Sequence, residues 1–289
     1  MVPPAEFRTY YDRPVLKTPV WKHWIPAYMF VGGVSAGSSL LAEALAWSGD
    51  RRGARRARAT ALVAIAAGAG FLVADLGRQD RFHHMLRVFR PSSPMNMGTW
   101  LLTAYGPAVG AAALADEIGL TGVARVGSVV AAGLAPAIAT YTGVLVADTA
   151  VPVWHDAYRE LPFVFAAGTA ASAGAAAVLV APPGRVPEAA TRLALLGAIA
   201  EIGAVAAMRK RLGSFIGEVY EEGEAARLET AARATTVAGA ALLVPRVTRR
   251  LGAALVFTGA ALQRFAITAA GTQSARDPKY VVVPQRARI

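Results

Sequence analysis

Residues 24–47 read WIPAYMFVGGVSAGSSLLAEALAW, an apolar stretch that contains one charged residue, Glu43. An α-helix rises 1.5 Å per residue, so about 20 residues cross the roughly 30 Å of hydrocarbon in a bilayer. The stretch is long enough to do so and carries too little charge for the surface of a soluble domain. It therefore predicts a transmembrane helix.

The rest of the chain repeats this pattern. The further predicted spans are 59–76, 97–115, 126–147, 162–181, 189–208, 231–247 and 251–270. Together they predict an all-α polytopic transmembrane bundle of about eight helices over 24–271, with both termini on the same side. A polar N-terminal segment, 1–23, and a polar C-terminal tail, 272–289, flank it. The chain's 55% hydrophobic and 17% charged composition agrees with a membrane protein.

Cysteine count and charge exclude several classes of protein. The 289 residues include no Cys, which excludes disulfides, thiolate-bound iron–sulfur clusters and cysteine-based zinc sites. The net charge of +11 comes from Lys and Arg placed between apolar runs, where basic residues flank lipid headgroups. This arrangement argues against nucleic acid and favours a lipid membrane as the partner.

Glycine spacing predicts close helix packing at two places. Gly33 and Gly37 lie four residues apart in the first span, and Gly106 and Gly110 do so in the third. Such GxxxG pairs let two helix backbones approach closely.

An even number of spans places the termini on one face with the segments 77–96, 148–161 and 209–230, and we call this the terminal face. Its loops are the long ones, so we expect a partner protein to dock there. Of the 30 Lys and Arg residues, 11 fall on the opposite face and 19 on the terminal face. That count places the terminal face in the cytoplasm, whereas the dense cluster 51–58 after the first span favours the reverse. The sequence leaves the orientation open.

Haem is a common cofactor of redox membrane bundles and needs His ligands inside the hydrocarbon layer. The four histidines of the chain all fall at span ends or in terminal-face loops: His23, His83, His84 and His155. We therefore expect no haem and no metal site in this chain, and electrons would have to come from a partner.

Several polar residues cluster near the terminal face. They are His23 and Tyr28 in the first span, Asp75 and Arg78 at the end of the second, and Tyr141 and Asp148 towards the end of the fourth. Tyr, His and Asp at this depth can donate to a quinone's carbonyl oxygens and exchange its protons. The alternative is that these residues are ordinary anchors at the membrane interface.

Three ionisable residues lie deeper, namely Glu43, Glu201 and Arg264. Charge inside a membrane is costly and marks a proton or ion path by default, so these three and Asp148 are candidates for a proton path. The alternative is that Glu43 reaches the opposite face, and that Arg264 pairs with a carboxylate or lies at the interface.

Particular motifs resemble a known family. They are Tyr11-Asp12-Arg13-Pro14-Val15-Leu16-Lys17, Trp24-Ile25-Pro26, Gly32-Gly33, Asp75-Leu76-Gly77-Arg78, Arg81-Phe82, Met85-Leu86-Arg87-Val88, Ser92-Ser93-Pro94-Met95, Gly98-Thr99-Trp100, Tyr141-Thr142-Gly143-Val144-Leu145, Gly271 and Ser274-Ala275-Arg276-Asp277-Pro278. The chain resembles the NrfD family, the polysulfide-reductase membrane-subunit type.

The resemblance implies an eight-helix subunit of the prokaryotic cytoplasmic membrane that carries no bound redox centre. Such a subunit binds menaquinone or ubiquinone near a ferredoxin-like iron–sulfur subunit, which connects it to a molybdopterin-type oxidoreductase subunit. Tyr141 corresponds to the family's quinone-binding Tyr of the fourth span, and Asp75 and Arg78 match the family's Asp-Leu-Gly-Arg run. Tyr28 stands where some members have His, and His23 lies one turn earlier.

Three hypotheses follow. The leading one is electron exchange between a partner's clusters and a quinone held by Tyr141, Tyr28, His23 and Asp75. The second is a membrane anchor without quinone chemistry. The third is a proton-translocating subunit, which would need Glu43, Glu201 and Arg264 to form one connected chain.

Overall fold

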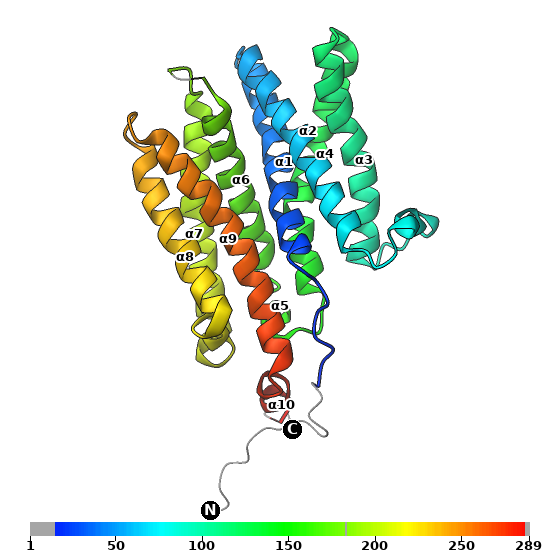
Figure 1. Cartoon of the computed structure of the whole chain (residues 1–289), viewed down its shortest axis with the longest axis vertical. Helices are drawn as coiled ribbons and strands as arrows, with labels where there is room; N and C mark the ends of the chain where they lie inside the picture. Colours follow the sequence, from blue (N-terminus) through cyan, green and yellow to red (C-terminus); the bar gives the residue numbers. More distant parts are fainter. Residues whose placement is uncertain (1–14, 183, 287–289) are drawn as a thin grey trace, which may run out of the picture.

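The computed structural model describes residues 15–182 and 184–286, and this part of the chain is all-α. Its long helices lie side by side in one bundle (Figure 1). They are α1 (Trp24–Trp47), α2 (Arg51–Asp75), α3 (Pro94–Glu117), α4 (Thr121–Ala147), α6 (Leu161–Val180), α7 (Glu188–Gly217), α8 (Gly223–Leu243) and α9 (Arg249–Arg276). The shorter elements are η2 (Gln79–Arg87), α5 (Pro152–Asp156), η3 (Glu218–Tyr220) and α10 (Lys279–Arg286).

Each predicted span overlaps one long helix. Several helices extend beyond the predicted span, whereas the span 231–247 runs past the end of α8 at Leu243. Helix α2 begins at Arg51 rather than at residue 59, because the Asp50 carboxylate caps it by accepting from the Gly53 N–H at 2.9 Å. The predicted polar tail is also partly helical, since α9 continues to Arg276 and α10 follows. The predicted segments at 1–14 and 287–289 lie outside the described residues.

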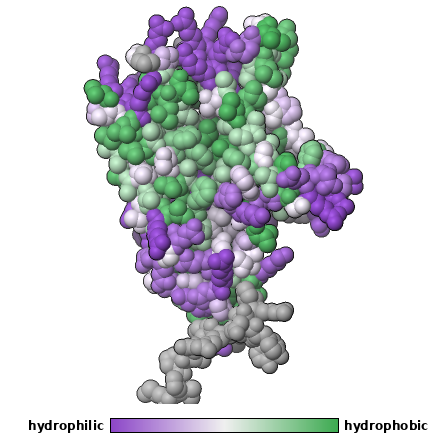
Figure 2. Space-filling view, in the orientation of Figure 1, coloured by the Kyte–Doolittle hydropathy of each residue, from purple (hydrophilic) through white to green (hydrophobic). Residues whose placement is uncertain are grey.

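Six of the described helices are long and apolar enough to cross a membrane: α1, α2, α4, α6, α7 extended through η3, and α9. The chain is therefore a multi-pass membrane protein. Helices α3 and α8 are also long but are not among these six. The first half of α8 carries the charged residues Glu224, Arg227, Glu229 and Arg233. Figure 2 shows hydrophobic surface between two hydrophilic ends of the molecule.

Helices α1 and α6 form the centre of the bundle. In α1, 72% of the most apolar window is buried inside the protein, against 28% in α2, because α1 also contacts α4, α6 and α9. Consecutive helices pair as α1–α2, α3–α4, α6–α7 and α8–α9. The central contact of α1 with α6 thus joins two groups of helices. The first group consists of α1, α2, α3 and α4, and we call it the α1–α4 group; the second consists of α6, α7, α8 and α9, and we call it the α6–α9 group.

Small residues make the central contact close. A Cβ atom at Gly33 would lie 2.8 Å from the Thr169 hydroxyl oxygen, and one at Gly37 would lie 2.8 Å from the Thr169 carbonyl oxygen. The predicted close packing at this GxxxG pair is confirmed. No described atom lies within 4 Å of a Cβ built at Gly106 or Gly110, so the prediction was wrong for that pair.

Ion pairs tie helices together at the end opposite the chain termini. Arg125 of α4 contacts Glu43 of α1 at 2.8 Å, and Arg58 of α2 contacts Asp116 of α3 at 3.2 Å. Two more pairs are Arg55 with Glu117 and Arg249 with Glu188. Several of the basic residues at this end therefore hold neighbouring helices together.

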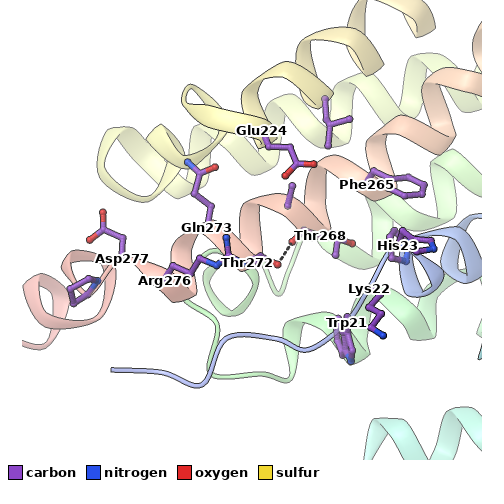
Figure 3. Close-up of a pocket in the computed structure, with 14 residues that line it drawn as sticks. Trp21, Lys22, His23, Glu224, Phe265, Thr268, Thr272, Gln273, Arg276 and Asp277 are labelled. Atoms are coloured by element: carbon purple, nitrogen blue, oxygen red, sulfur yellow. Dashed lines mark hydrogen bonds between the residues drawn. The ribbon is translucent and has the colours of Figure 1, made fainter. Parts of the chain in front are cut away.

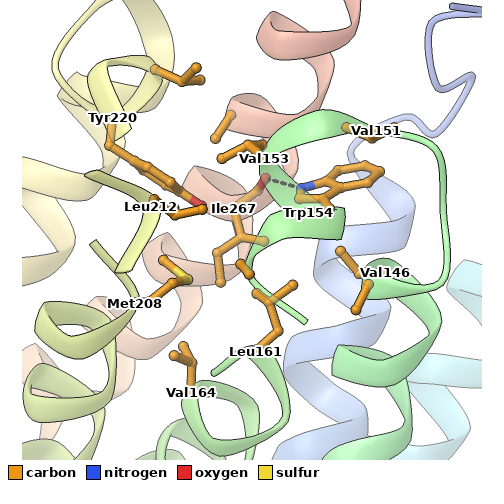
Figure 4. Packing of buried hydrophobic residues seen from close by; sticks show 14 of the residues in the cluster. Val146, Val151, Val153, Trp154, Leu161, Val164, Met208, Leu212, Tyr220 and Ile267 are labelled. Atoms are coloured by element: carbon orange, nitrogen blue, oxygen red, sulfur yellow. Dashed lines mark hydrogen bonds between the residues drawn. The ribbon is translucent and has the colours of Figure 1, made fainter. Parts of the chain in front are cut away.

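The core at the other end is organised by Trp154 of α5 (Figure 4). Its buried indole N–H donates to the Ile267 carbonyl of α9 at 2.7 Å, and its ring stacks on Trp21 with centroids 5.3 Å apart. The indole lies directly against Gly271 of α9, where a Cβ atom would overlap it. One side chain thus joins α5, α9 and the segment before α1.

Helix α10 is fastened to the same end of the bundle. Lys279 Nζ lies 2.8 Å from the Glu218 carboxylate, and the Tyr280 hydroxyl donates to that carboxylate at 3.0 Å. Burial raises the pKa of Tyr280 to about 12, so its hydroxyl keeps its proton at physiological pH. The first described residues and α10 therefore lie at one end of the bundle, which corresponds to the predicted terminal face and which we call the terminal end (Figure 1).

Replacing Gly271 with Ala should destabilise the fold by about 1–3 kcal/mol, because the added methyl group must displace the Trp154 indole. A Gly133→Ala variant is the control, since a Cβ there meets open space and alanine favours a helix. Thermal unfolding of the detergent-solubilised proteins measures both effects. Equal melting temperatures for the two variants would contradict the role given to Trp154.

Candidate functional site

Tyr28 lies on the inner face of α1, one turn above the start of the helix. Its ring is buried against α2, where a Cβ atom at Gly68 would lie 3.4 Å from the ring's Cδ2. Below it, Trp24 stacks on Phe71 of α2 with centroids 5.6 Å apart. Helices α1 and α2 therefore hold the Tyr28 ring in a defined position.

Tyr141 of α4 packs on α3 in the same region. A Cβ atom at Gly98 would lie 2.9 Å from Cδ2 and 3.3 Å from Cζ of the Tyr141 ring, so the glycine leaves the space that the ring fills. Tyr28 and Tyr141 belong to the same hydrophobic core, together with Phe71 and Leu102. The structure thus brings these two predicted site residues to one core.

Neither tyrosine hydroxyl makes a hydrogen bond within the described part of the chain. Tyr105 of α3 is different, because its hydroxyl bonds to Ser35 at 3.0 Å and to Ser39 at 2.8 Å on α1. The hydroxyls that are buried without a partner include that of Tyr220 but not those of Tyr28 and Tyr141, whose oxygens therefore border accessible space. Tyr28 and Tyr141 can therefore donate to a bound molecule, whereas Tyr105 is committed to the protein.

Asp75 ends α2 and is half-buried. Its carboxylate accepts from the Lys22 backbone N–H at 3.4 Å, which fixes the segment before α1 beside the end of α2. Arg78 is exposed and precedes η2, and among the described residues no ion pair joins it to Asp75. The Arg78 side chain is therefore not held by Asp75 in the described structure.

His23 borders a different space. A cavity of about 760 Å³ opens between the segment before α1 and helices α8 and α9 (Figure 3). Trp21, Lys22 and His23 line one side of it, and Glu224 and Arg276 are among the residues on the other. Tyr28, Asp75 and Tyr141 do not line this cavity. Exposed Asp148 caps the end of α4 and is also absent from it.

The loop that carries η2 is held by Asn96, a residue whose role the sequence did not reveal. The Asn96 side-chain amide donates to the Met85 carbonyl at 3.1 Å and to the Val88 carbonyl at 2.9 Å, and its oxygen accepts from the Arg90 N–H at 2.6 Å. This folded loop exposes aromatic and basic side chains at the terminal end: Arg81, Phe82, Arg87 and Phe89.

The deep ionisable residues form two separate pairs. Glu201 of α7 lies 3.2 Å from Arg264 of α9, and Arg264 also donates to the Phe165 carbonyl at 3.0 Å. Glu43 instead pairs with Arg125 near the opposite end. No hydrogen bond or ion pair connects Glu43 to Glu201 in the described structure, so the single chain required by the translocation hypothesis is not found.

The described residues contain no group of three or more His, Asp or Glu side chains that could hold a metal ion. The absence of Cys rules out a thiolate-bound iron–sulfur cluster in this chain. Electron transfer through such clusters would therefore need another subunit.

Comparison with known proteins identifies the family. A family model described as polysulphide reductase, NrfD, matches residues 14–273. That range includes α1 to α8 and most of α9. It also includes every residue that is described above as packing beside Tyr28 or Tyr141. A comparison with curated proteins finds no match. The chain therefore belongs to the NrfD family, the membrane subunits of polysulphide reductase-type complexes.

Proposed function

We propose that this chain is the quinone-binding membrane subunit of a multi-subunit redox complex. It exchanges electrons between a ferredoxin-like iron–sulfur subunit and the quinone pool, and the iron–sulfur subunit is in turn connected to a molybdopterin-type catalytic subunit. Family membership supports this assignment, together with the two partnerless tyrosine hydroxyls at one core. The lack of Cys in this chain requires that the iron–sulfur centres lie in a partner.

The proposed setting is the prokaryotic cytoplasmic membrane, crossed by eight helices. In this arrangement α3 and α8 cross as well as the six more apolar helices. Helix α3 has 24 residues and packs along α4, which supports a span of the same length. Helix α8 packs along α9 in the same way, and its charged first half would face the solution at the terminal end.

The proposed quinone site lies between Tyr28 of α1 and Tyr141 of α4. A bound menaquinone or ubiquinone would supply two-electron, two-proton redox chemistry there. The Tyr141 and Tyr28 hydroxyls would donate hydrogen bonds to its carbonyl oxygens. The apolar side chains of Phe71 and Leu102 would exclude water from the ring, and this apolar lining fits a quinone headgroup.

Asp75 and His23 are the proposed proton-exchanging groups. Asp75 is half-buried at the end of α2, and exposed His23 precedes α1, so both would reach the solution at the terminal end. The Lys22–Asp75 hydrogen bond joins their two segments. Arg78 would begin the η2 loop that a partner contacts.

Removing the Tyr141 hydroxyl tests the site most simply. Tyr141→Phe should lower quinone-linked turnover of the intact complex about tenfold, the equivalent of about 1.4 kcal/mol for one lost hydrogen bond. Tyr158→Phe, at an exposed tyrosine of the same end, should leave turnover unchanged. Unchanged turnover in Tyr141→Phe would remove Tyr141 from the site. A purified complex without quinone that ignores added quinol analogues would favour the simple membrane anchor.

A second variant moves the same ring without removing its hydroxyl. Gly98→Ala should raise the KM for quinol, because the new methyl group must push the Tyr141 ring out of its place. Gly110→Ala, on the same helix but facing open space, is the control. If steady-state kinetics of the two variants agree, the position of the Tyr141 ring has no bearing on quinone binding.

The η2 loop should contribute to docking of the iron–sulfur partner. Replacing exposed Arg81 and Arg87 with Ser should weaken the complex by roughly tenfold, through loss of charge at the interface rim. Replacing Arg51 and Arg52 with Ser, at the other end of the bundle, should have no effect. Copurification of the partner measures both, and equal recovery would place the docking surface elsewhere.

A further inference from the structure

A second cavity lies inside the α6–α9 group, away from Tyr28 and Tyr141. It has a volume of about 220 Å³ and lies between α7, α8 and α9. Polar and charged side chains from all three helices line it: Glu201, Arg209, Glu229, Arg233, Thr236 and Gln263. Such a polar lining between the helices of a membrane protein is unusual, because apolar side chains would fill the space at lower cost.

Two buried polar atoms at this cavity have no protein partner. The Glu201 side chain uses Oε1 to contact Arg264, and its Oε2 has no hydrogen bond. The side-chain nitrogen of Gln263 is also without a partner. Both residues are more than nine-tenths buried and line the cavity. Because such atoms are costly to bury unpaired, and the space beside them is large enough for several water molecules, water is the partner that fits them.

The cavity has a polar route to the terminal end. Arg209 lines it and contacts Glu229 at 3.6 Å and the exposed carboxylate of Glu221 at 2.8 Å. Helix α7 packs much less closely on α8 than on α6, so the seam beside Arg209 is comparatively open. The charged first half of α8 runs along this seam.

The route ends at Glu201. On its far side the pair with Arg264 lies against Gly168 of α6, where even a Cβ atom would overlap the two side chains. The Arg264 guanidinium covers the Phe165 ring, 4.3 Å from its centroid. Helix α6 contributes no ionisable side chain at all. Exposed Ala206 and Arg233 also line the space, so it is open between α7 and α8 and closed towards the bundle centre.

We propose that this cavity is a water-filled well through which Glu201 exchanges protons with the solution at the terminal end. A proton carried by the well's water would bind to Oε2 of Glu201 and return by the same route, while Oε1 keeps its contact with Arg264. The charged groups that face Glu201 from the packed helices are Arg264 of α9, Arg209 of α7, and Glu229 and Arg233 of α8. The well uses no residue of the proposed quinone site, so either can fail without the other.

Introduced thiols test for water, because this chain has no Cys and each new thiol is the only one in this subunit, on which its labelling is followed. Val205→Cys and Thr236→Cys would line the well, whereas Val256→Cys would be buried elsewhere and Val237→Cys would lie on the exposed side of α8. A charged methanethiosulfonate reacts with thiolate, which forms only in water. Applied to the complex in lipid nanodiscs, it should modify the two lining thiols about tenfold faster than the two controls. Equal rates at all four positions would show that the well is dry and overturn the proposal.

Carbodiimide labelling tests for the proton. Dicyclohexylcarbodiimide consumes protonated carboxyl groups, and peptide mass analysis locates the product. Glu201 should be modified, more slowly as the bulk pH rises, and more slowly again in Val205→Phe, which fills the well. Glu43, buried in its pair with Arg125, is the matched control and should not respond to Val205→Phe. The proposal would be overturned if Glu201 stayed unmodified at every pH, or if its rate of modification depended neither on pH nor on Val205→Phe. Either result would count whatever the quinone activity of the complex.

Discussion

The contact of α1 with α6, through Gly33 and Gly37 on one helix and Thr169 on the other, is the most extensive of the contacts that join the two halves of the bundle, beside those of α4 with α6 and of α1 with α9. Inside a membrane, apolar surface gives little driving force for association, so helices must gain from close packing. Glycines at this seam allow α1 to lie deep in the bundle, where it contacts α2, α4, α6 and α9. The position of Tyr28 on α1 depends on this seam.

The two faces of α6 serve different halves of the molecule. Thr169 packs on α1, and the neighbouring Gly168 lies against the pair formed by Glu201 and Arg264. The proposed quinone site therefore belongs to the α1–α4 group and the proposed well to the α6–α9 group. In these proposals both sites communicate with the terminal end, where Trp154 joins α5 and α9 to the segment before α1. A partner docked there would be close to both.

Much of the fold follows from the sequence because apolar length is a local property. The limits of α1 agree with the predicted 24–47 at both ends, and every other predicted span overlaps one long helix, although 231–247 runs past the end of α8 at Leu243. The differences between the predicted spans and the observed helices have a physical cause. Helix α2 extends to Arg51 through a cap at Asp50, and α10 is fastened by a contact with distant Glu218, neither of which hydropathy records. The glycine pair at 106 and 110 shows that spacing alone does not say which face of a helix has a neighbour.

The candidate site was predicted in part because depth in the membrane and residue type are also local properties of the sequence. Tyr28 and Tyr141 could be chosen by depth and residue type, and the structure brings them to one core. Which polar residues share a cavity depends on how the helices pack in three dimensions. For this reason the position of His23 beside α8 and α9, the partner of Glu43, and the role of Gln263 could not be read from the chain.

The central claim is that quinone binds between α1 and α4, and photoaffinity labelling tests it directly. The intact complex in its native membrane would be irradiated with an azido-substituted quinone, with and without excess unlabelled quinone, and the labelled peptides identified by mass spectrometry. The account predicts competable labelling within 24–47 and 121–147. Labelling confined to α7, α8 and α9, or labelling that excess quinone does not reduce, would contradict it.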